Sequence, residues 1–483
     1  MVVKLSHRFF LGIVFALFGS ILYAANRDQV IAELNFVQNT IRSAHPGYAL
    51  EDSNFLAAYH LGYSGALEFT GKFREGDGVT PYIQKYLTTF QDPHLIYSVE
   101  PVSAREDLWV GWALKWNGED YRVSYVGLNN RTLAPPMGAS LVSCDNVNIS
   151  EFIKRAIAPF VDQRLHLDAS HDAAVNALVV KGRNEALPEF VRPSFCKFSY
   201  SGLFIDHRLE WVPMSIVDHR GVYGGQDNNF SVKAVKNSLM WMKIPSFVIT
   251  DENFERFARG FEKIDRHLPL VLDVRKNSGG NGMVGAKILS KLGLSGQDGS
   301  ESARNHAYWR VSTVGIDSLK ARLLHMEESG FGISSIADWI RTMQSLLIHA
   351  KKDGETWVAQ PDFKAVSPVI NGGISSRVAN KIYVLTDRTC ASACLDFVRA
   401  VKKHKAVYHV GETTNAGSIF NDVAYVDTPL GNRLSLPLKY WQSTDDLRAP
   451  IIPDYQLPFD VQDTRSVITW LILNERGCQS QVF

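Results

Sequence analysis

The sequence predicts an α/β protein in which a βαβ-type core follows a helical N-terminal region and an inserted β-rich module. Two short apolar runs, 270–275 and 382–385, are typical of buried strands, and each continues into a polar or glycine-rich turn and then a helix. This alternation indicates parallel strands covered by helices. A chain of 483 residues with 45% hydrophobic residues is large enough for two or three domains.

Residues 1–25 differ from the rest of the chain in the order of their charged and apolar residues. Lys4 and Arg8 precede an uncharged run that ends in Ala24 and Ala25. A basic start, a short apolar stretch and small residues at its end are typical of a secretory signal peptide. We therefore expect cleavage after Ala24 or Ala25 and an extracytoplasmic protein, periplasmic or secreted, with no stable membrane insertion after cleavage. The alternative is a retained anchor, for which the run is at the short limit of a membrane span.

The charge and the cysteine usage exclude several classes of partner and site. The formal net charge is +1, and no long basic run is present, so we expect no nucleic acid partner. Five cysteines are an odd number, which leaves at least one without a partner in the chain and the pairing open. Cys390 and Cys394 have no second pair and no histidine cluster near them, so we expect no zinc, and no other metal or cofactor is required.

Changes in the hydrophobic pattern divide the mature chain into five parts. A helical N-terminal region ends where His94 enters a strand. A glycine, a short strand, an Asx turn and a helix follow; they resemble the second half of a PDZ-like module, and another small β-rich insertion is the alternative. The predicted parts are the helical region at 26–104, the PDZ-like module at 105–160, a β-rich connecting region at 161–235, the core at 236–460 with a helical insertion at 301–370, and a C-terminal helix and tail at 461–483.

A serine at the start of a predicted helix is the first candidate for chemistry. Ser392 follows the strand at 382–385 and a polar turn, and helical periodicity begins at Cys394. The unpaired N–H groups and the positive dipole end of a helix N-terminus favour the oxyanion that forms when a serine attacks a carbonyl. The alternative is an ordinary N-cap serine, which is the commoner role at such a position.

A glycine-rich loop is predicted beside this serine. The loop at 276–282 follows the strand at 270–275, so it and Ser392 both lie at the carboxyl ends of parallel strands, where such sheets place their sites. The loop lacks the lysine of a phosphate-binding loop and the spacing of a dinucleotide-binding one. Its glycines let backbone N–H groups approach a reacting carbonyl. We therefore predict an oxyanion hole formed by the N–H groups of Gly280 and Ala393.

Five segments, in order, resemble the tail-specific (C-terminal-processing) serine peptidases. That family usually carries an L-D-L-R-x-N-x-G-G run at a strand and its glycine-rich loop, and its nucleophile is followed by a small residue and soon by an acid. The resemblance implies a serine peptidase core and protein or peptide substrates. The matching segments are 241–247, 272–280, 389–397, 411–414 and 452–454.

The same resemblance implies which residue is the base. One branch of the family uses a lysine in a G-K-G turn after the serine, whereas the turn at 416–418 is Ala-Gly-Ser here. The branch that includes the tricorn core and the chlamydial protease-like activity factor uses a histidine in a D-G-H-type motif, and 92–94 is Asp-Pro-His. The resemblance thus implies that His94 is the general base for an acyl-enzyme on Ser392.

The third member of the triad and an alternative base follow from the same resemblance. The family places a carboxylate that orients the histidine shortly before the terminal Pro-Asp. The usual glutamate position holds Leu447, so the adjacent Asp446 is expected in this role, with Asp445 as the alternative. Lys439 is an alternative base, although a lysine at the predicted strand edge 437–441 is more often simply exposed.

The sequence therefore predicts an exported serine endopeptidase that needs no cofactor. The alternative is a non-catalytic ligand- or peptide-binding module on the same fold, as in the interphotoreceptor retinoid-binding modules, because loss of the usual glutamate is consistent with lost activity. A large separation between Ser392 and His94 in space would favour that alternative.

Overall fold

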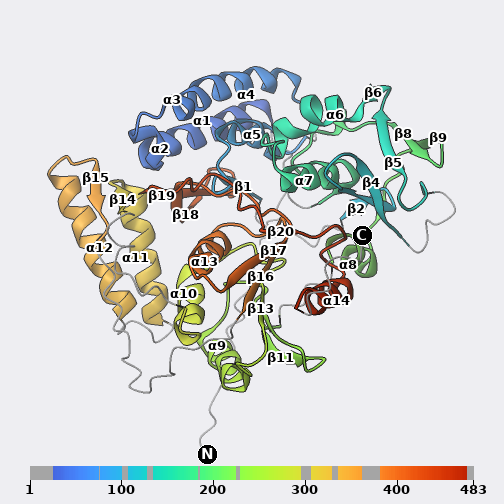
Figure 1. The fold of residues 1–483 in the computed structure, drawn as a ribbon. Helices are drawn as coiled ribbons and strands as arrows, with labels where there is room; N and C mark the ends of the chain where they lie inside the picture. Colours follow the sequence, from blue (N-terminus) through green and yellow to red (C-terminus); the bar gives the residue numbers. More distant parts are fainter. Residues whose placement is uncertain are drawn as a thin grey trace, which may run out of the picture.

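The computed structural model is a mixed α/β structure, which confirms the predicted fold class (Figure 1). The predicted signal, Cys478 and parts of the predicted helical insertion lie outside the described residues. The described residues are 26–74, 77–99, 107–127, 134–182, 185–224, 229–294, 306–328, 335–361 and 381–475.

A mostly parallel sheet forms the centre of the core. Its strand order is β11-β12-β13-β16-β17-β20, and only β11 and β12 run antiparallel. β13 and β16 are buried along their whole length, as their unbroken apolar sequences require. Leu270 pairs with Ile382, which brings the carboxyl ends of these two strands to the same edge. The strands are β11 (Ser231–Val235), β12 (Leu239–Lys243), β13 (Leu270–Asp273), β16 (Ile382–Thr386), β17 (Val407–Gly411) and β20 (Tyr455–Gln456).

Helices cover both faces of this sheet. On one face α9, α10 and α13 pack through apolar side chains such as Phe254, Ile288 and Phe397. On the other face α14 packs through Val467 and Leu471. The two helices that follow β13 and β16 are therefore held by the core, and their N-termini lie at the carboxyl edge of the sheet (Figure 1). The helices are α9 (Asp251–Ala258), α10 (Gly282–Lys291), α13 (Ala393–Lys402) and α14 (Thr464–Glu475).

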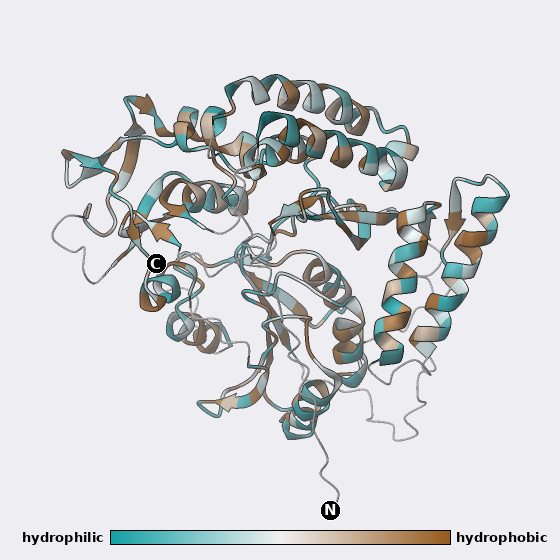
Figure 2. Cartoon of the chain, turned by 180° about the vertical axis from the view of Figure 1, so that it is seen from behind, coloured by the Kyte–Doolittle hydropathy of each residue, from teal (hydrophilic) through white to brown (hydrophobic). Residues whose placement is uncertain are grey.

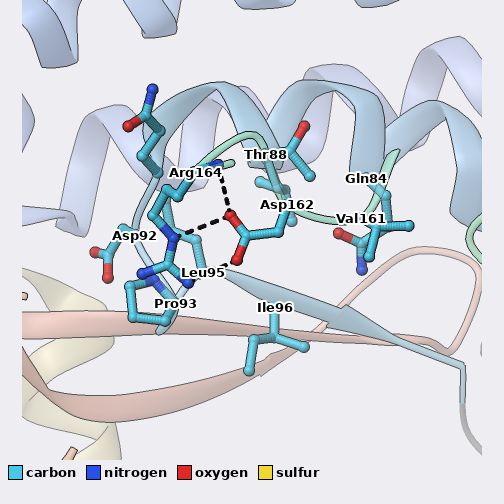
Figure 3. Close-up of a pocket in the computed structure, with 11 residues that line it drawn as sticks. Gln84, Thr88, Asp92, Pro93, Leu95, Ile96, Val161, Asp162 and Arg164 are labelled. Carbon is cyan, nitrogen blue, oxygen red and sulfur yellow. Dashed lines mark hydrogen bonds and ion pairs between the residues drawn. The ribbon is translucent and has the colours of Figure 1, made fainter. Parts of the chain in front are cut away.

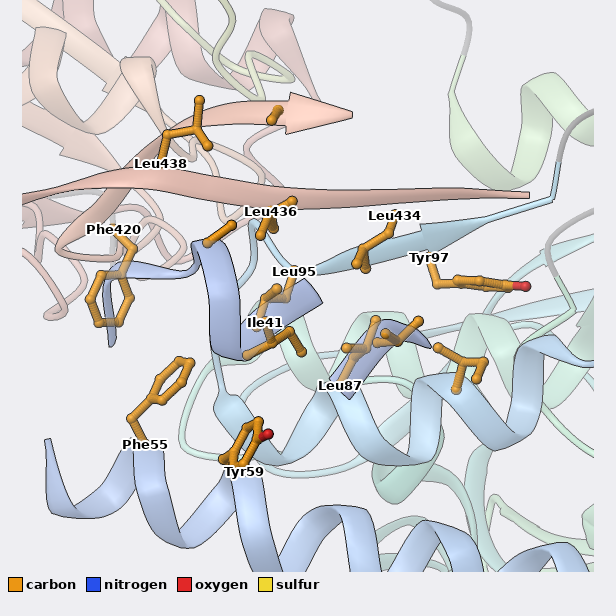
Figure 4. Packing of buried hydrophobic residues seen from close by; sticks show 14 of the residues in the cluster. Ile41, Phe55, Tyr59, Leu87, Leu95, Tyr97, Phe420, Leu434, Leu436 and Leu438 are labelled. Atoms are coloured by element: carbon orange, nitrogen blue, oxygen red, sulfur yellow. The ribbon is translucent and has the colours of Figure 1, made fainter. Parts of the chain in front are cut away.

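A second sheet joins the N-terminal region to the C-terminal part of the chain. Its long strand β19 pairs with β18 along one side and with β1 and β14 along the other. The N-terminal helices pack on this sheet, and Figure 4 shows Ile41 and Leu87 facing Leu434 and Leu436. The elements are α1 (Arg27–Ala44), α2 (Pro46–Ala49), α3 (Ser53–Ala57), α4 (Tyr63–Phe69), α5 (Thr80–Leu87), β1 (Ile96–Ser98), β14 (His306–Arg310), β15 (Trp357–Ala359), β18 (Phe420–Asp427) and β19 (Arg433–Gln442).

The β-rich part, which lies between β1 and β11 in sequence, has its own core and one disulfide. Cys144 on β5 is bonded to Cys196 on β8. The interval interpreted as a β-rich connection, 161–235, holds the helices α7 and α8 as well as strands. Its elements are β2 (Leu108–Trp109), β3 (Trp112–Trp116), β4 (Tyr121–Val126), β5 (Ser140–Cys144), β6 (Val147–Asn148), α6 (Ile149–Phe152), α7 (Asp168–Val179), β7 (Val180–Lys181), β8 (Phe195–Tyr200), β9 (Leu203–Arg208), β10 (Val212–Pro213) and α8 (Ile216–Tyr223).

The predicted helical insertion contains a helix pair at the side of the core. The two helices are α11 (Thr313–Glu328) and α12 (Ser335–Lys352). In Figure 2 hydrophobic and hydrophilic residues alternate along both, as expected for helices that bury one face. Leu319 and Leu347 are fully buried in the same core as the N-terminal helices. Within the described residues, no helix has the length and apolar character needed to cross a membrane.

Candidate active site

Ser392 lies at the N-terminus of α13 but does not cap it. Its backbone has φ 52° and ψ −126°, and its side chain makes no cap hydrogen bond. A residue with a Cβ adopts this conformation at a cost of about 1–3 kcal/mol, and such strain is concentrated at functional sites. The hydroxyl of Ser392 is therefore left available at a sharp strand-to-helix turn, as in a nucleophile elbow.

Gly279 packs directly against this turn. A Cβ on Gly279 would lie 2.8 Å from the Ser392 Cβ, 2.8 Å from the carbonyl oxygen of Ala391 and 3.1 Å from the amide nitrogen of Ala393. Its φ of +106° also favours glycine. Asn277 holds the loop in place, since its side chain accepts from the Gly279 N–H at 2.9 Å and donates to the carbonyl of Ile244 at 3.0 Å. The glycine-rich loop and the serine turn thus touch through backbone atoms.

The backbone around Gly280 leaves its N–H group free to act as a donor. Phe247 donates its N–H to the carbonyl of Gly279 at 2.8 Å and accepts the N–H of Asn281 at 3.0 Å. A parallel bridge of this kind uses both polar groups of Phe247 and neither of Gly280, whose N–H faces the other way. The predicted donors Gly280 and Ala393 line one cavity together with Ser392.

A buried carboxylate ties the two loops together. Asp387 accepts the backbone N–H of Lys276 at 3.0 Å and the N–H and hydroxyl of Thr389 at 3.0 and 2.6 Å. Next to it, Arg388 donates to the carbonyl of Trp116 on β3 at 2.8 Å and pairs with Asp172 on α7 at 3.1 Å. The turn that carries the serine is therefore fixed to the glycine-rich loop and to the β-rich part.

His94 reaches the same cavities as Ser392 from the N-terminal region. It lies just before β1, and the Ser435 hydroxyl on β19 donates to its carbonyl at 3.0 Å. Both side chains line a cavity of about 910 Å³ and a neighbouring one of about 650 Å³. The structure thus brings Ser392 and His94 together, although they are far apart in sequence.

Asp92 is the carboxylate that the structure places against His94. Its Oδ1 accepts the His94 backbone N–H at 3.0 Å and lies 3.4 Å from His94 Nδ1, and its Oδ2 lies 3.2 Å from His45 Nε2. His45 Nδ1 accepts the N–H of Gly47 at 3.0 Å, so Nε2 carries the proton and donates to Asp92. The buried Asp92 carboxylate thus lies between two imidazoles: it is hydrogen-bonded to the His45 ring, whereas His94 Nδ1 is buried and lies near it without a hydrogen bond of good geometry.

These contacts set the protonation of the three side chains. Burial alone raises the pKa of Asp92, but hydrogen bonds and charges of His45 and His94 outweigh it and leave the pKa lowered. Burial lowers the pKa of His45, and Asp92 offsets this only partly. For His94, burial also lowers the pKa, but Asp92, the charge of Asp396 and the carbonyl of Phe420 outweigh it, so the pKa is raised above 6.5.

The structure does not bring Asp446 to His94 in the same way. Asp446 is exposed, and its Oδ1 accepts the backbone N–H of Arg448 at 3.0 Å. Asp445 is exposed too and lines the larger cavity. The role given to Asp446 stays a prediction, and Asp92 is a carboxylate that the resemblance did not point to.

The prediction that Lys439 is an exposed residue at a strand edge is wrong. β19 is paired on both sides at this position, with Trp309 and with Asn421, so Lys439 is buried. Its Nζ donates to Gln360 Oε1 at 2.9 Å and lies 3.3 Å from Asp422 Oδ2. Lys439 still lines the smaller of the two cavities, but its Nζ is directed to Gln360 and Asp422.

A separate small cavity lies behind the loop that carries His94. It has a volume of about 220 Å³ and is lined by Asp92, Pro93, Asp162 and Arg164 among others (Figure 3). Arg164 forms a two-pronged pair with Asp162 at 2.8 and 2.9 Å. The side of this cavity that faces residues 92 and 93 is therefore lined by a charged pair.

Two features at the site were not assigned from the sequence. Asp396, one turn after Ser392 on α13, lines both cavities. Cys390 and Cys394 form a disulfide that spans Ser392. The four-residue spacing of these cysteines allows a bond across one helical turn, so the sequence permitted this disulfide but did not single it out among the possible pairings. No group of three or more metal-ligating side chains occurs among the described residues.

Comparisons with known proteins concern the family of the core and the fold of the chain. Residues 239–457 match the model of peptidase family S41. The structure of mature CPAF complexed with lactacystin has a TM-score of 0.63 and 13% identity, and the match covers 94% of this chain and 98% of that one. A second structure of mature CPAF has a TM-score of 0.62, 13% identity and coverages of 94% and 97%. At this identity the likeness shows the fold.

Other comparisons add less. The tricorn protease has a TM-score of 0.40 and 11% identity, with 93% of this chain and 37% of that chain covered, which is too weak to carry an argument. No curated protein matches the chain. Together, the family match and the arrangement of the parallel sheet, the glycine-rich loop and the serine turn lead to one conclusion. The chain contains a domain of peptidase family S41 and is a serine-type peptidase.

Proposed function

We propose that the protein is an exported serine endopeptidase that acts through an acyl-enzyme on Ser392. The observation that carries this proposal is the strained, uncapped Ser392, which shares two cavities with His94 and the smaller of them also with Gly280 and Ala393. Export is supported by the predicted signal at 1–25 and by two disulfides, which form and persist in oxidising compartments.

The proposed mechanism assigns one step to each group. Ser392 Oγ attacks the peptide carbonyl while His94 removes the hydroxyl proton. The N–H groups of Gly280 and Ala393 donate to the oxyanion, and His94 then protonates the leaving amine. Water, deprotonated by His94, hydrolyses the acyl-enzyme. Asp92 is proposed to orient His94 and to stabilise its charged form; it is a positioning residue.

A covalent probe tests this proposal. We expect a fluorophosphonate to label the purified mature protein and Ser392→Ala to remove the labelling completely, because the probe reacts only with an activated serine hydroxyl. Peptide mapping of the labelled protein should locate the adduct on Ser392. Absence of labelling in folded wild-type protein would instead favour a ligand- or peptide-binding module without activity.

The dependence of activity on pH tests the role of Asp92. Since a general base must be neutral, kcat/KM should rise with pH through the pKa of His94, which lies above 6.5. In Asp92→Asn this apparent pKa should fall, because the negative charge that favours the imidazolium is gone, and kcat should fall by about tenfold. Asp446→Asn is the matched comparison. A shift in Asp446→Asn with none in Asp92→Asn would return the orienting role to Asp446.

A further inference from the structure

We propose that the disulfide between Cys390 and Cys394 is a positioning element that holds the nucleophile Ser392 in its active conformation. This proposal rests on the function proposed for Ser392. Cys390 lies in the turn after β16, and Cys394 lies in the first turn of α13. Both are fully buried. The bond therefore closes a short covalent ring whose middle residue is the serine.

A serine at the start of a helix ordinarily adopts the unstrained N-cap conformation. In this protein the N-caps Ser215 and Thr250 have extended backbones, with φ near −70°, and their hydroxyls accept a backbone N–H from the first turn of the helix. Ser392 occupies the same position but has φ 52° and makes no such bond. Relaxation to the ordinary conformation would turn the hydroxyl toward the helix and away from the cavity. Something must oppose that relaxation.

Hydrogen bonds hold each side of the serine separately. Before it, the carbonyl of Cys390 accepts the N–H of Asn415 at 3.1 Å. After it, the N–H of Leu395 donates to the carbonyl of Ser392 at 2.9 Å, as in any helix start. Among the described residues, the one backbone hydrogen bond that crosses the serine joins the Cys394 N–H to the Ala391 carbonyl at 3.0 Å, and a normal N-cap turn tolerates this bond. The disulfide adds a covalent link between the two sides, so it restricts rotation about the Ser392 backbone.

The second disulfide provides a matched control. Cys144 and Cys196 are also fully buried, but they join β5 to β8 in the β-rich part. Their separation in sequence is 52 residues, against 4 for the bond at the serine. Because the stabilising effect of a disulfide grows with the length of the loop that it closes, removing the Cys144–Cys196 bond should lower the melting temperature more. If the Cys390–Cys394 bond positions the nucleophile, its removal should lower the activity more than removal of the Cys144–Cys196 bond does.

The experiment compares two double variants with the wild type. In Cys390→Ala/Cys394→Ala we expect the rate of fluorophosphonate labelling and kcat to fall by about 10–100-fold with KM little changed, and the melting temperature to fall only slightly. In Cys144→Ala/Cys196→Ala we expect a larger fall in melting temperature and a labelling rate close to that of the wild type. The proposal would be overturned if the first variant were labelled at the wild-type rate. It would also be overturned if, in both variants, the loss of labelling rate simply followed the loss of melting temperature.

Reduction of the wild-type protein gives an independent measurement if the first variant does not fold. Dithiothreitol gives two electrons and two protons to the Cys390–Cys394 bond, which becomes two thiols while the reagent closes to its cyclic disulfide. Alkylation and mass mapping then report which bond is open. We expect labelling to slow in step with opening of this bond and to recover on reoxidation, and unchanged labelling would contradict the proposal. Failure of the oxidised wild type to label would count against the proposed function instead.

Discussion

Replacing His94 by alanine is expected to lower kcat/KM by about 10⁴–10⁶-fold, because the nucleophile loses the group that accepts its proton. His94 is the imidazole that shares both cavities with Ser392, and Asp92 Oδ1 lies 3.4 Å from its Nδ1. Asp92 keeps its contact with His45 in the variant, so the fold should persist. The measurement is peptide hydrolysis together with the far-ultraviolet circular dichroism spectrum of each variant.

Two comparisons make this result specific. Lys439→Ala should retain most of the labelling by fluorophosphonate, since Lys439 is engaged by Gln360 and Asp422. Added imidazole should restore part of the activity of His94→Ala, because it can enter the space left by the side chain. Loss of labelling in Lys439→Ala with labelling kept in His94→Ala would assign the base to the lysine.

Replacing Gly279 by alanine is expected to lower kcat by about 10²–10³-fold, the loss typical of one missing oxyanion donor. The new Cβ would come within 2.8 Å of the Ala391 carbonyl and of the Ser392 side chain, and backbone atoms cannot move aside cheaply. The glycine-rich loop and the serine turn would therefore separate, and the N–H of Gly280 would leave the oxyanion. The measurement is kcat and KM on a peptide substrate.

Gly118 offers a close control for this variant. Its φ is +103°, against +106° at Gly279, but no atom lies within 4 Å of the Cβ position. Gly118→Ala therefore introduces the same backbone strain without the contact at the serine. We expect Gly118→Ala to lose some stability and keep its kcat. Equal losses of kcat in the two variants would mean that strain, and not the contact with Ser392, is responsible.

The parts of the fold that follow from local sequence were predictable. Buried parallel strands have unbroken apolar runs, so β13 and β16 and the loops at their carboxyl ends could be located from the pattern alone. The helices α11 and α12 lie within the helical insertion expected at 301–370. Ser392 and the glycine-rich loop are placed by these local signals.

Features that depend on pairing between distant segments were not predictable. Lys439 is buried because β14 and β18 both pair with β19, and no local pattern shows that a strand is central. The contact between Asp92 and His94 depends on a tight turn, and that between Asp92 and His45 depends on the docking of α1 and α2. The Cys390–Cys394 bond is local, but the odd number of cysteines left several pairings open, and the structure was needed to choose among them.

The pairing of β1 with β19 also has a consequence for the synthesis of the protein. His94 is carried by the segment before β1, whose residue Ile96 pairs with Ser435, and Ser435 also holds the His94 carbonyl. Because a chain emerges from the ribosome N-terminus first, β1 has no strand partner until residues 433–435 have emerged. The strand pairing that fixes the position of the proposed base is therefore completed only after the segment that carries the proposed nucleophile has been synthesised.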